Sequence, residues 1–494
     1  MLNNKMVKII ATLGPASKSK IIIKEIIKNG ADVVRLNFSH GNYDFFSRAI
    51  KDIREISRDA GILIDLPGPK IRTGKLARKE IFLKKGGRVV LTSKNIISDG
   101  SNIFINYPYL GKDIKLNSHV YIDDGKIKIK VIKKLSEDEL LSEVAIGGVL
   151  REEKGVNFPD AVLSIPSVTD NDIEFLKFGA ARDVDMFAVS FVRKPEDIIY
   201  VKNFLKNNYP EKEFLIIAKI EKIEAVKNIG KIAEAADALM VARGDLGVEA
   251  PVENIPLEQK KIISAANFYK KPVITATQML LSMVENESPT RAEVTDISNA
   301  IFDGTDSVML SEETATGKYP ACAVRYMSKI IRATEKSRIF NEAGKFGEID
   351  KTGGYFRKYG DFNNRAERTE NISLIIAEMT VAASKLLKNS IIIAITRSGY
   401  TANLISSLRP GVPILAVVSD ERIKRKLSLN FGVSCIVAEN IADKNVFSEN
   451  LTDIIGGWLS ADKRRSFSFA VLTGGIPIGE PGSTDFVKIV KIKN

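Results

Sequence analysis

Eight short apolar runs lie between residues 7 and 311, and they constrain the fold more than any other feature of the sequence. Each run is rich in β-branched residues and ends in polar residues or glycine, as do strands that are buried on both faces of a parallel sheet. Segments of helical periodicity separate most of the runs. Eight such strands alternating with helices predict an α/β fold, a closed parallel (β/α)8 TIM barrel. The runs are VKIIATLG, DVVRLNF, ILIDLPG, DMFAVSF, FLIIAKIE, ALMVARGD, PVITATQ and SVMLSEE.

The strand that ends at Asp65 is followed by a segment of different character instead of a helix. Apolar and polar residues alternate in this segment, and Gly-Gly and Asp-Asp-Gly turns divide it, which predicts antiparallel strands of a small inserted β-barrel. A domain inserted in one barrel loop is well placed to act as a lid over an active site. Its alternating runs are EIFLKKGGRVVLTS, HVYIDDGKIKIKVIKK and LLSEVAIGGV.

The C-terminal part of the chain predicts a third domain. Five apolar runs alternate there with helical segments, which indicates an α/β domain with a five-stranded sheet. A polar, glycine-bearing stretch before it is typical of a linker or mobile segment. The expected division is a barrel in two parts, 1–70 and 155–337, a lid at 71–154, a linker at 338–366 and a C-terminal effector domain at 367–494.

Composition narrows the class of protein. With 494 residues and 44% hydrophobic residues, the chain is too large for a single binding module and apolar enough to bury several cores. It has no apolar stretch of membrane-spanning length and no secretory signal pattern, which predicts a cytoplasmic protein. Cys322 and Cys435 have no metal-ligand spacing. The net charge of +12 is dispersed, so we expect small phosphorylated substrates and neither nucleic acid nor a membrane as partner.

Polar residues that follow the eight runs are the candidates for an active site, because barrel enzymes build their sites at the carboxyl ends of the strands. Each residue alone is also suited to a structural role as a cap or an exposed charge. Their convergence at one end of the barrel favours a site. The candidates are Arg35, Asn37, Ser39, Asp65, Lys219, Glu221, Arg243, Asp245, Thr277, Ser311, Glu312 and Glu313.

Lys219 and Glu221 lie two residues apart at one strand end and therefore project to the same side of an extended strand. Asp245 follows the next strand. Two carboxylates without a neighbouring histidine or cysteine suit a hard cation such as Mg²⁺ or Mn²⁺, completed by substrate oxygens. A metal-free salt-bridge network of Lys219, Glu221 and Arg243 fits the same residues, and both interpretations stay open.

Several weaker signals concern anion binding. No dinucleotide-binding or P-loop motif occurs, so a nucleotide must be held in another way. Residues 396–401 join a strand to a helix, where they would cradle a phosphate or merely cap the helix. Gly244 precedes Asp245 in a segment that forms an anion-binding loop or a tight turn. His40 follows a polar strand end, but no Ser-His-Asp arrangement is apparent.

Longer strings in the chain go beyond these general patterns. In the order in which they occur, they are ATLGPAS (11–17), VRLNFSHG (34–41), DLPGPKIRTG (65–74), KGVNFP (154–159), AKIE (218–221), MVARGDLGVE (240–249), ATQML (276–280), SPTRAEVTDISNAIFDGTD (288–306) and LSEETATGKYP (310–320). Together they resemble the pyruvate kinase family, whose architecture agrees with the three predicted domains. The C-terminal domain carries the resemblance more weakly, through TRSGYTANLISSLRP (396–410) and TGGIPIGEPGST (473–484).

The resemblance implies a glycolytic phosphotransferase, which moves the phosphoryl group of phosphoenolpyruvate to ADP and yields pyruvate and ATP. It implies that Lys219 faces the transferring phosphoryl group while Glu221 and Asp245 hold Mg²⁺. The substrate would be bound by Arg35, Lys219, Gly244, Asp245 and Thr277, with Thr277 also helping to relay a proton and Ser311 as a further catalytic participant. The nucleotide would be bound by Asn37, Phe38, Ser39, His40, Arg72 and Lys154.

One departure from the family concerns potassium. The resemblance implies a K⁺ site at Asn37, Ser39, Asp65 and Leu66. Potassium-dependent members typically carry glutamate where this chain has Lys70, and often threonine where it has Leu66. An ammonium group at this place would supply the charge that K⁺ brings elsewhere. We therefore hypothesise an enzyme that depends little on K⁺, although Asn37, Ser39 and Asp65 of the K⁺ site are present.

The resemblance also concerns regulation and assembly. It implies allosteric control by a phosphorylated metabolite and a homotetramer. Two other functions remain open from the residues alone: a barrel lyase or aldolase that needs no nucleotide, and a basic RNA-binding protein that keeps the scaffold. The effector phosphate would be bound by Thr396, Arg397, Ser398, Gly399, Tyr400 and Thr401.

Overall fold

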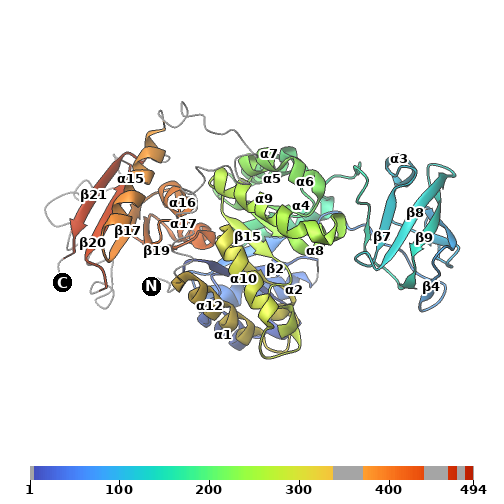
Figure 1. Cartoon of the computed structure of the whole chain (residues 1–494), viewed down its shortest axis with the longest axis horizontal. Helices are drawn as coiled ribbons and strands as arrows, with labels where there is room; N and C mark the ends of the chain where they lie inside the picture. The colour runs from blue at the N-terminus through green and yellow to red at the C-terminus, as the bar shows by residue number, and fades with distance from the viewer. Residues whose placement is uncertain (1–4, 40, 338–370, 439–465, 476–483, 493–494) are drawn as a thin grey trace.

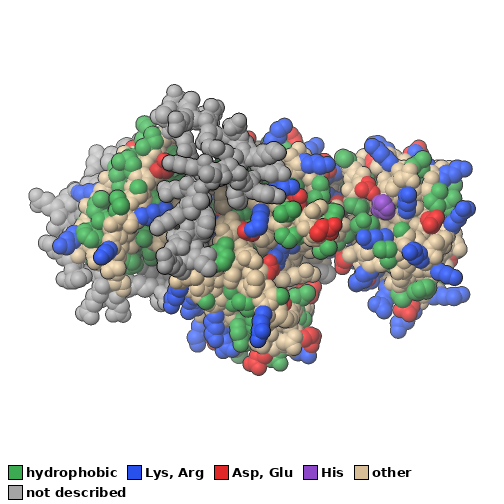
Figure 2. All heavy atoms as spheres, viewed as in Figure 1, with side chains coloured by type: hydrophobic (Ala, Val, Ile, Leu, Met, Phe, Trp, Pro, Cys, Tyr) green, Lys and Arg blue, Asp and Glu red, His purple; other side chains and the backbone are tan. Residues whose placement is uncertain are grey.

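The computed structural model describes residues 5–39, 41–337, 371–438, 466–475 and 484–492. Figure 1 shows three bodies in a row: the barrel in the middle, the inserted domain at one end and the C-terminal domain at the other. Figure 2 shows Lys and Arg side chains scattered over the visible face, with acidic side chains between them. In this view the positive charge forms no continuous patch, in agreement with the dispersed charge of the sequence.

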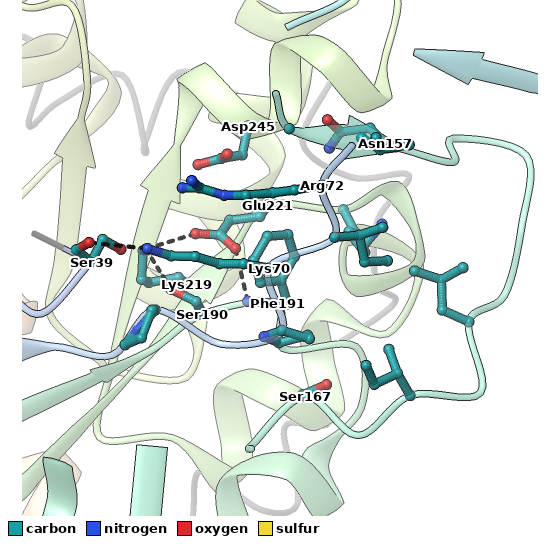
Figure 3. Close-up of a pocket in the computed structure, with 18 of the residues that line it drawn as sticks. Ser39, Lys70, Arg72, Asn157, Ser167, Ser190, Phe191, Lys219, Glu221 and Asp245 are labelled. Atoms are coloured by element: carbon teal, nitrogen blue, oxygen red, sulfur yellow. Dashed lines mark hydrogen bonds and ion pairs between the residues drawn. The ribbon is translucent and has the colours of Figure 1, made fainter. Parts of the chain in front are cut away.

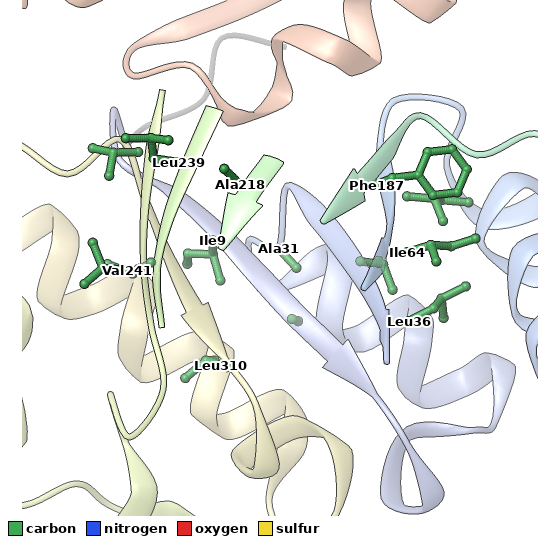
Figure 4. Close-up of a cluster of buried hydrophobic side chains, with 14 of the residues drawn as sticks. Ile9, Ala31, Leu36, Ile64, Phe187, Ala218, Leu239, Val241 and Leu310 are labelled. Carbon is green, nitrogen blue, oxygen red and sulfur yellow. The ribbon is translucent and has the colours of Figure 1, made fainter. Parts of the chain in front are cut away.

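The eight predicted runs form a closed barrel of parallel strands, in the spatial order β1-β16-β15-β14-β13-β12-β3-β2. Successive residues alternate between the barrel interior and the helix layer, as the period of a strand requires. Ile10 and Leu63 lie in the interior core, whereas Ile9 and Ile64 pack beneath the helices (Figure 4). The strands are β1 (Lys8–Leu13), β2 (Val33–Asn37), β3 (Gly61–Asp65), β12 (Met186–Val189), β13 (Leu215–Ile220), β14 (Ala238–Ala242), β15 (Val273–Ala276) and β16 (Ser307–Leu310).

Helices surround the barrel, and their ends are set by local capping. At the start of α10 the Thr290 hydroxyl accepts from the N–H of Glu293, whose carboxylate accepts from the N–H of Thr290. The helix ends at Gly304, which has a φ of 99°. The helices of the barrel are α1 (Lys20–Lys28), α2 (Tyr43–Ile56), α4 (Asp170–Ala180), α5 (Pro195–Asn208), α6 (Ile223–Lys227), α7 (Ile229–Ala235), α8 (Arg243–Glu249), α9 (Ile255–Phe268), α10 (Arg291–Asp303), α11 (Glu312–Ala315) and α12 (Pro320–Lys336).

The inserted domain differs in detail from the expected closed, antiparallel β-barrel. It has a six-stranded sheet, β11-β7-β8-β9-β5-β6, and a separate pair, β10-β4, around one core. Gly147 lies between β9 and β10, and a Cβ there would lie 2.3 Å from the Leu83 carbonyl oxygen, so this close approach requires glycine. The β5–β6 pair is parallel. The elements are β4 (Ile81–Leu83), β5 (Arg88–Thr92), β6 (Asn102–Phe104), α3 (Leu110–Asp113), β7 (His119–Ile122), β8 (Ile127–Lys134), β9 (Glu139–Ile146), β10 (Gly148–Leu150) and β11 (Val156–Asn157).

The sheet of the inserted domain extends beyond residue 154, where the sequence places the boundary. Strand β11 pairs with β7, so residues up to Asn157 belong to this sheet. Phe158 and Leu163 also contribute to its core. The segment that returns to the barrel is therefore packed against the inserted domain and is not a loose tether.

The C-terminal domain has the predicted five-stranded sheet, in the order β19-β18-β17-β20-β21. Four strands are parallel, and β21 runs antiparallel to β20. The expected linker at 338–366 lies outside the described residues. The elements are α15 (Ile372–Leu386), β17 (Ser390–Ile395), α16 (Tyr400–Ser407), β18 (Ile414–Val418), α17 (Glu421–Lys426), β19 (Val433–Val437), β20 (Phe469–Gly474) and β21 (Phe486–Lys491).

A buried ion-pair cluster joins the C-terminal domain to the barrel. Arg425 of α17 donates from Nε to Asp185 Oδ1 at 2.6 Å and from Nη2 to Asp183 Oδ1 at 2.9 Å. Arg54 of α2 also binds Asp185 Oδ2, at 2.5 Å. Leu429, just beyond α17, is fully buried in the interior core of the barrel. The C-terminal domain therefore closes one end of the barrel with both charge and apolar contact.

Replacement of Arg425 by methionine is expected to lower the free energy of unfolding by about 2–4 kcal/mol, because it leaves the buried Asp185 carboxylate with one partner fewer. Urea unfolding followed by circular dichroism measures the change. The matched control is Arg422→Met, since Arg422 is exposed on the same helix. We expect less than about 0.5 kcal/mol there, and equal losses in the two variants would contradict the prediction.

Within the part of the chain that the structure describes, no helix is both long and apolar enough to cross a membrane.

Candidate active site

A cavity of about 270 Å³ opens at the carboxyl ends of the barrel strands (Figure 3). The barrel contributes Lys219, Glu221 and Asp245 to its lining, and the inserted domain contributes Asp124 and Asn157. The inserted domain thus borders the mouth of the barrel. The cavity is also lined by Arg35, Asn37, Ser39, Lys70, Arg72, Ser190, Phe191, Arg193 and Lys222.

Lys219 is the centre of the polar contacts in this cavity. Its Nζ lies 2.6 Å from Ser190 Oγ, 2.8 Å from Glu221 Oε1 and 3.1 Å from Asp65 Oδ1. The side chain is only 12% exposed. The predicted projection of Lys219 and Glu221 to one side is therefore confirmed.

The electrostatics of the cluster favour an additional cation. Burial disfavours the charged form of Lys219, but the attraction of Asp65 and Glu221 outweighs it and raises the pKa of Lys219. Burial also opposes ionisation of Asp65, yet Lys219 and Arg35 hold its pKa below the ordinary value. In contrast, burial raises the pKa of Glu221 to about 7, and the nearby Asp245 adds to this rise. A cation bound beside Glu221 and Asp245 would therefore favour the ionised forms of these buried carboxyl groups.

Glu221 and Asp245 are placed to share a hard cation. Glu221 Oε2 accepts from the N–H of Phe191 at 2.8 Å, and Figure 3 shows Asp245 facing the same cavity. Burial raises the pKa of Asp245, although Lys219 opposes the rise. Among the described residues no three His, Cys, Asp or Glu side chains converge. Two carboxylates nevertheless suit Mg²⁺, which usually takes its other ligands from water and substrate phosphate.

Arg243 does not join this cluster. Its Nη1 binds Asp296 of α10 at 2.9 and 2.7 Å. The network of Lys219, Glu221 and Arg243, one of the two interpretations left open by the sequence, is therefore wrong in its third member. The pair Lys219–Glu221 exists, because both side chains turn inward from β13, whereas the guanidinium turns outward to meet an acidic helix residue.

Arg35 lies beside the cluster. It donates from Nε to Asp65 Oδ2 at 2.7 Å and from Nη1 to Thr12 Oγ1 at 3.0 Å. Asn37 and Ser39 line the cavity as well. The Phe38 side chain does not line it; the ring is buried and stacks on Phe46 with centroids 3.9 Å apart. His40 lies outside the described residues.

Lys70 reaches the place that the resemblance assigns to potassium. Its Nζ donates to the carbonyl oxygen of Ser39 at 3.1 Å. Burial lowers the pKa of Lys70, and the charges of Arg72 and Lys219 lower it further. The Leu66 side chain is buried, and its carbonyl oxygen accepts from Ser190 Oγ at 2.6 Å.

Thr277 and Ser311 lie at the neighbouring strand ends and are not among the residues that line the cavity. The N–H of Gly244 donates to Thr277 Oγ1 at 2.8 Å, and this hydroxyl donates to the Ala276 carbonyl at 2.6 Å. The N–H of Ser311 donates to Glu313 Oε2 at 2.7 Å. Within the described residues, the Ser311 hydroxyl is buried and has no hydrogen-bond partner.

The two basic residues expected from the inserted segment behave differently. Arg72 lines the cavity, and Figure 3 shows it reaching in beside Asp245. The Lys154 Nζ instead lies 3.1 Å from Asp123 Oδ1 on the adjacent turn of the same domain. The structure thus brings Arg72, but not the Lys154 ammonium, to the lysine and carboxylates of the barrel.

Sequence reasoning missed Ser190 and Arg193. Ser190 is the polar residue that follows the fourth apolar run, so the strand-end rule would have found it. It links Lys219 to the backbone of Leu66. Arg193 binds the carbonyl oxygens of Leu163 and Ile165 on the segment that returns from the inserted domain. No local sequence pattern predicts this contact, because it depends on how two separate loops pack against each other.

The loop at 396–401 lies far from this cavity, between β17 and α16 of the C-terminal domain. Thr396 Oγ1 accepts from the N–H of Gly399 at 3.0 Å, and Thr401 Oγ1 lies 2.8 Å from Thr484 Oγ1. Arg397 and Ser398 are exposed. The Thr396 hydroxyl therefore holds Gly399, the residue before α16, while Arg397 and Ser398 face solvent.

Comparison with known proteins identifies the family. Residues 4–324 match the family model of the pyruvate kinase barrel domain, and residues 375–490 match that of the pyruvate kinase alpha/beta domain. The chain belongs to the pyruvate kinase family. The pyruvate kinase of Thermococcus litoralis is 39% identical over 490 residues, covering 98% of each chain. That of Thermotoga maritima is 38% identical and covers 98% of this chain and 99% of its own.

A solved structure supports the same assignment. The crystal structure of a pyruvate kinase from Cryptosporidium parvum aligns with a TM-score of 0.87 and 31% identity, over 99% of this chain and 97% of the other. The resemblance, the fold class and the enzyme class expected from the sequence are confirmed. Like other pyruvate kinases, the enzyme transfers the phosphoryl group of phosphoenolpyruvate to ADP. The lyase and RNA-binding alternatives are therefore set aside.

Proposed function

We propose that Lys219 is the catalytic cation of this phosphotransfer. The supporting observation is its position: a buried ammonium held by Glu221, Asp65 and Ser190 at the floor of a cavity bordered by two domains. Phosphoryl transfer depends mostly on positioning and charge neutralisation. Lys219 and Arg35 would bind the phosphoryl oxygens of phosphoenolpyruvate and offset the charge that develops during transfer.

Glu221 and Asp245 would hold Mg²⁺, or Mn²⁺, next to Lys219. Burial raises the pKa of both carboxyl groups, and a bound cation would favour their ionised forms, which supports this proposal. When bound, the cation supplies charge neutralisation for the phosphoryl oxygens. Phe191 orients the Glu221 carboxylate through its N–H.

The substrate carboxylate would lie at the start of α8, near the backbone of Gly244 and Asp245 and the hydroxyl of Thr277. The hydrogen bonds that fix Thr277 Oγ1 support a role for this hydroxyl in delivering a proton to the enolate carbon. Ser311 at the next strand end is a further candidate, because its buried hydroxyl has no partner among the described residues.

ADP would bind between the barrel and the inserted domain, near Asn37, Ser39 and Arg72. The backbone of Phe38 would contribute, while its ring stays in the core. Closure of the inserted domain would bring Lys154 to the nucleotide phosphates. For this movement the lysine must leave Asp123, its present partner.

Replacement of Lys154 by alanine is expected to raise the KM for ADP by about tenfold to a hundredfold, the range for a lost hydrogen bond to a charged group. Steady-state kinetics with varied ADP measures the change. The matched control is Lys126→Ala, because Lys126 also pairs with Asp123 at 3.1 Å but lies on the exposed turn. Equal KM values for the two variants would remove Lys154 from the nucleotide site.

Lys70 would supply the charge that K⁺ provides in potassium-dependent relatives. Its ammonium donates a hydrogen bond to the Ser39 carbonyl. Ser39 belongs to the expected potassium site, together with Asn37, Asp65 and Leu66. The Lys70 ammonium would repel a K⁺ ion bound beside the same carbonyl oxygen. The site is therefore expected to function without potassium.

Three further properties are proposed for the whole protein. The exposed Arg397 and Ser398 beside the N-terminus of α16 support binding of a phosphorylated effector. Exposed apolar side chains of α15, including Met379 and Leu386, support burial in a homotetramer. Activation assays with phosphorylated metabolites and analytical ultracentrifugation test these two properties. The cytoplasmic location stays a prediction from the sequence.

The direct test of the mechanism is pyruvate formation from phosphoenolpyruvate with ADP and Mg²⁺, each omitted in turn. The proposal expects turnover only when both are present. Release of pyruvate without ADP would instead support the lyase mechanism. Omission of Mg²⁺ without loss of turnover would overturn the metal site at Glu221 and Asp245.

A further inference from the structure

We propose that Arg243 is a positioning residue that holds the Thr277 hydroxyl in its catalytic place. The inference rests on the proposed role of Thr277 in the reaction. Arg243 follows strand β14, and Thr277 follows strand β15, its neighbour in the barrel. The Arg243 side chain binds backbone carbonyl groups at and next to Thr277.

The backbone at Thr277 needs an external support. Thr277 has a φ of 67° and Gln278 a φ of 55°, so two successive residues other than glycine occupy the left-handed region. This conformation is especially unfavourable for a β-branched residue such as threonine. Strained backbone of this kind persists only where surrounding contacts over-determine it.

Arg243 provides these contacts. Its Nη2 donates to the Thr277 carbonyl at 2.7 Å, and its Nε donates to the Ala276 carbonyl at 3.2 Å. The guanidinium therefore binds the carbonyl groups of the strained residue and of the residue before it. The same Nη2 lies 2.7 Å from Met279 Sδ, which extends the contact past Gln278. A planar, five-donor group is suited to several acceptors at once.

Side chains of two helices, α10 and α9, fix the guanidinium group of Arg243. Its Nη1 binds both carboxylate oxygens of Asp296, at 2.9 and 2.7 Å, and lies 3.5 Å from Gln259 Oε1. The side chain is 13% exposed, while that of Asp296 is 37% exposed. Helix α10 thereby fixes the guanidinium, and the guanidinium fixes the loop after β15.

The arrangement sets the direction of the Thr277 hydroxyl. Oγ1 donates to the Ala276 carbonyl, which Arg243 also holds, and accepts from the N–H of Gly244, the residue after Arg243. Both partners of the hydroxyl are therefore fixed by Arg243, one through its side chain and one through its backbone. Loss of the guanidinium would leave the loop free to relax and move Oγ1 away from the substrate.

The test is a double-mutant cycle between Arg243→Gln and Thr277→Ala. We expect Arg243→Gln to lower kcat by about tenfold to a hundredfold, as a small misplacement of a reacting group does. The KM for ADP should stay within about twofold, because Arg243 does not line the cavity where the nucleotide is proposed to bind. In the Thr277→Ala background the same substitution should cost less than about threefold, since the hydroxyl that it positions is gone.

Two variants separate positioning from a merely structural role. Arg243→Lys keeps the charge beside Asp296 but cannot reach both carbonyls, so we expect normal thermal stability with kcat still reduced. Arg54→Gln removes a barrel arginine from its ion pairs with Asp183 and Asp185, and should lower stability without changing kcat. A full recovery of kcat in Arg243→Lys would overturn the inference.

The outcomes also distinguish the inference from the function on which it rests. If Thr277→Ala retains normal turnover, the proposed role of Thr277 is wrong. If Thr277→Ala loses turnover but Arg243→Gln lowers kcat by the same factor in both backgrounds, the role of Thr277 stands and only the inference about Arg243 is overturned.

Discussion

Lys219→Met is expected to lower kcat by about 10³-fold or more, the scale seen when a preorganised electrostatic group is removed from an active site. Methionine has a similar length and no charge, so the cavity would keep its shape. The loss arises because the ammonium near Ser190, Glu221 and Asp65 no longer offsets charge on the phosphoryl group. Steady-state turnover of phosphoenolpyruvate and ADP measures the effect.

Measurement of metal binding distinguishes a direct role of Lys219 in charge neutralisation from an indirect effect through loss of the metal. Removal of Lys219 takes a positive charge away from Glu221, so the affinity for Mn²⁺, followed by electron paramagnetic resonance, should stay equal or increase. The matched control is Lys202→Met, because Lys202 pairs with Asp237 on the outside of the barrel. Loss of Mn²⁺ binding together with turnover would show that Lys219 acts only through the metal site.

Lys70→Glu is expected to convert the enzyme into a potassium-dependent one. The parent should turn over in buffer without K⁺, because the Lys70 ammonium already lies 3.1 Å from the Ser39 carbonyl. The substitution replaces this cation by an anion beside the Ser39 carbonyl, so turnover without K⁺ should fall at least about tenfold. Added K⁺ should restore most of it. Turnover with K⁺ and with tetramethylammonium at equal ionic strength measures the effect.

Two controls make the potassium prediction specific. Lys75→Glu makes the same charge change at an exposed position of the inserted segment and should create no potassium requirement. Lys70→Met removes the charge without adding an anion, and should show a smaller requirement than Lys70→Glu. Strong activation of the parent enzyme by K⁺ would contradict the proposed role of Lys70.

Much of the fold could be predicted because buried parallel strands leave a strong local pattern. Each barrel strand is apolar on both faces, since one face meets the interior core and the other meets the helices. The inserted domain was predicted less completely. Strand β10 leaves β9 to pair with the distant β4, and a pairing between segments so far apart in the chain leaves no local pattern in the sequence.

The candidate site could be predicted to the extent that strand ends meet in a barrel. That rule placed Arg35, Asp65, Lys219 and Glu221 together, and the structure does so too. The rule predicts which residues lie at the strand ends, but it does not predict the direction in which each side chain points. The ring of Phe38 therefore turned out to lie in the core, although its neighbours line the cavity.

The sequence by itself determined the barrel, the order of the domains and the residue types at the strand ends, because hydrophobic periodicity and motif spacing are properties of the local chain. Only the tertiary structure decided which charges pair. Arg243 pairs with Asp296 on α10, the helix that follows the next strand of the barrel, and Lys154 pairs with Asp123. Such choices depend on distances between segments far apart in the chain, where an ion pair gains or loses its strength within a few ångströms.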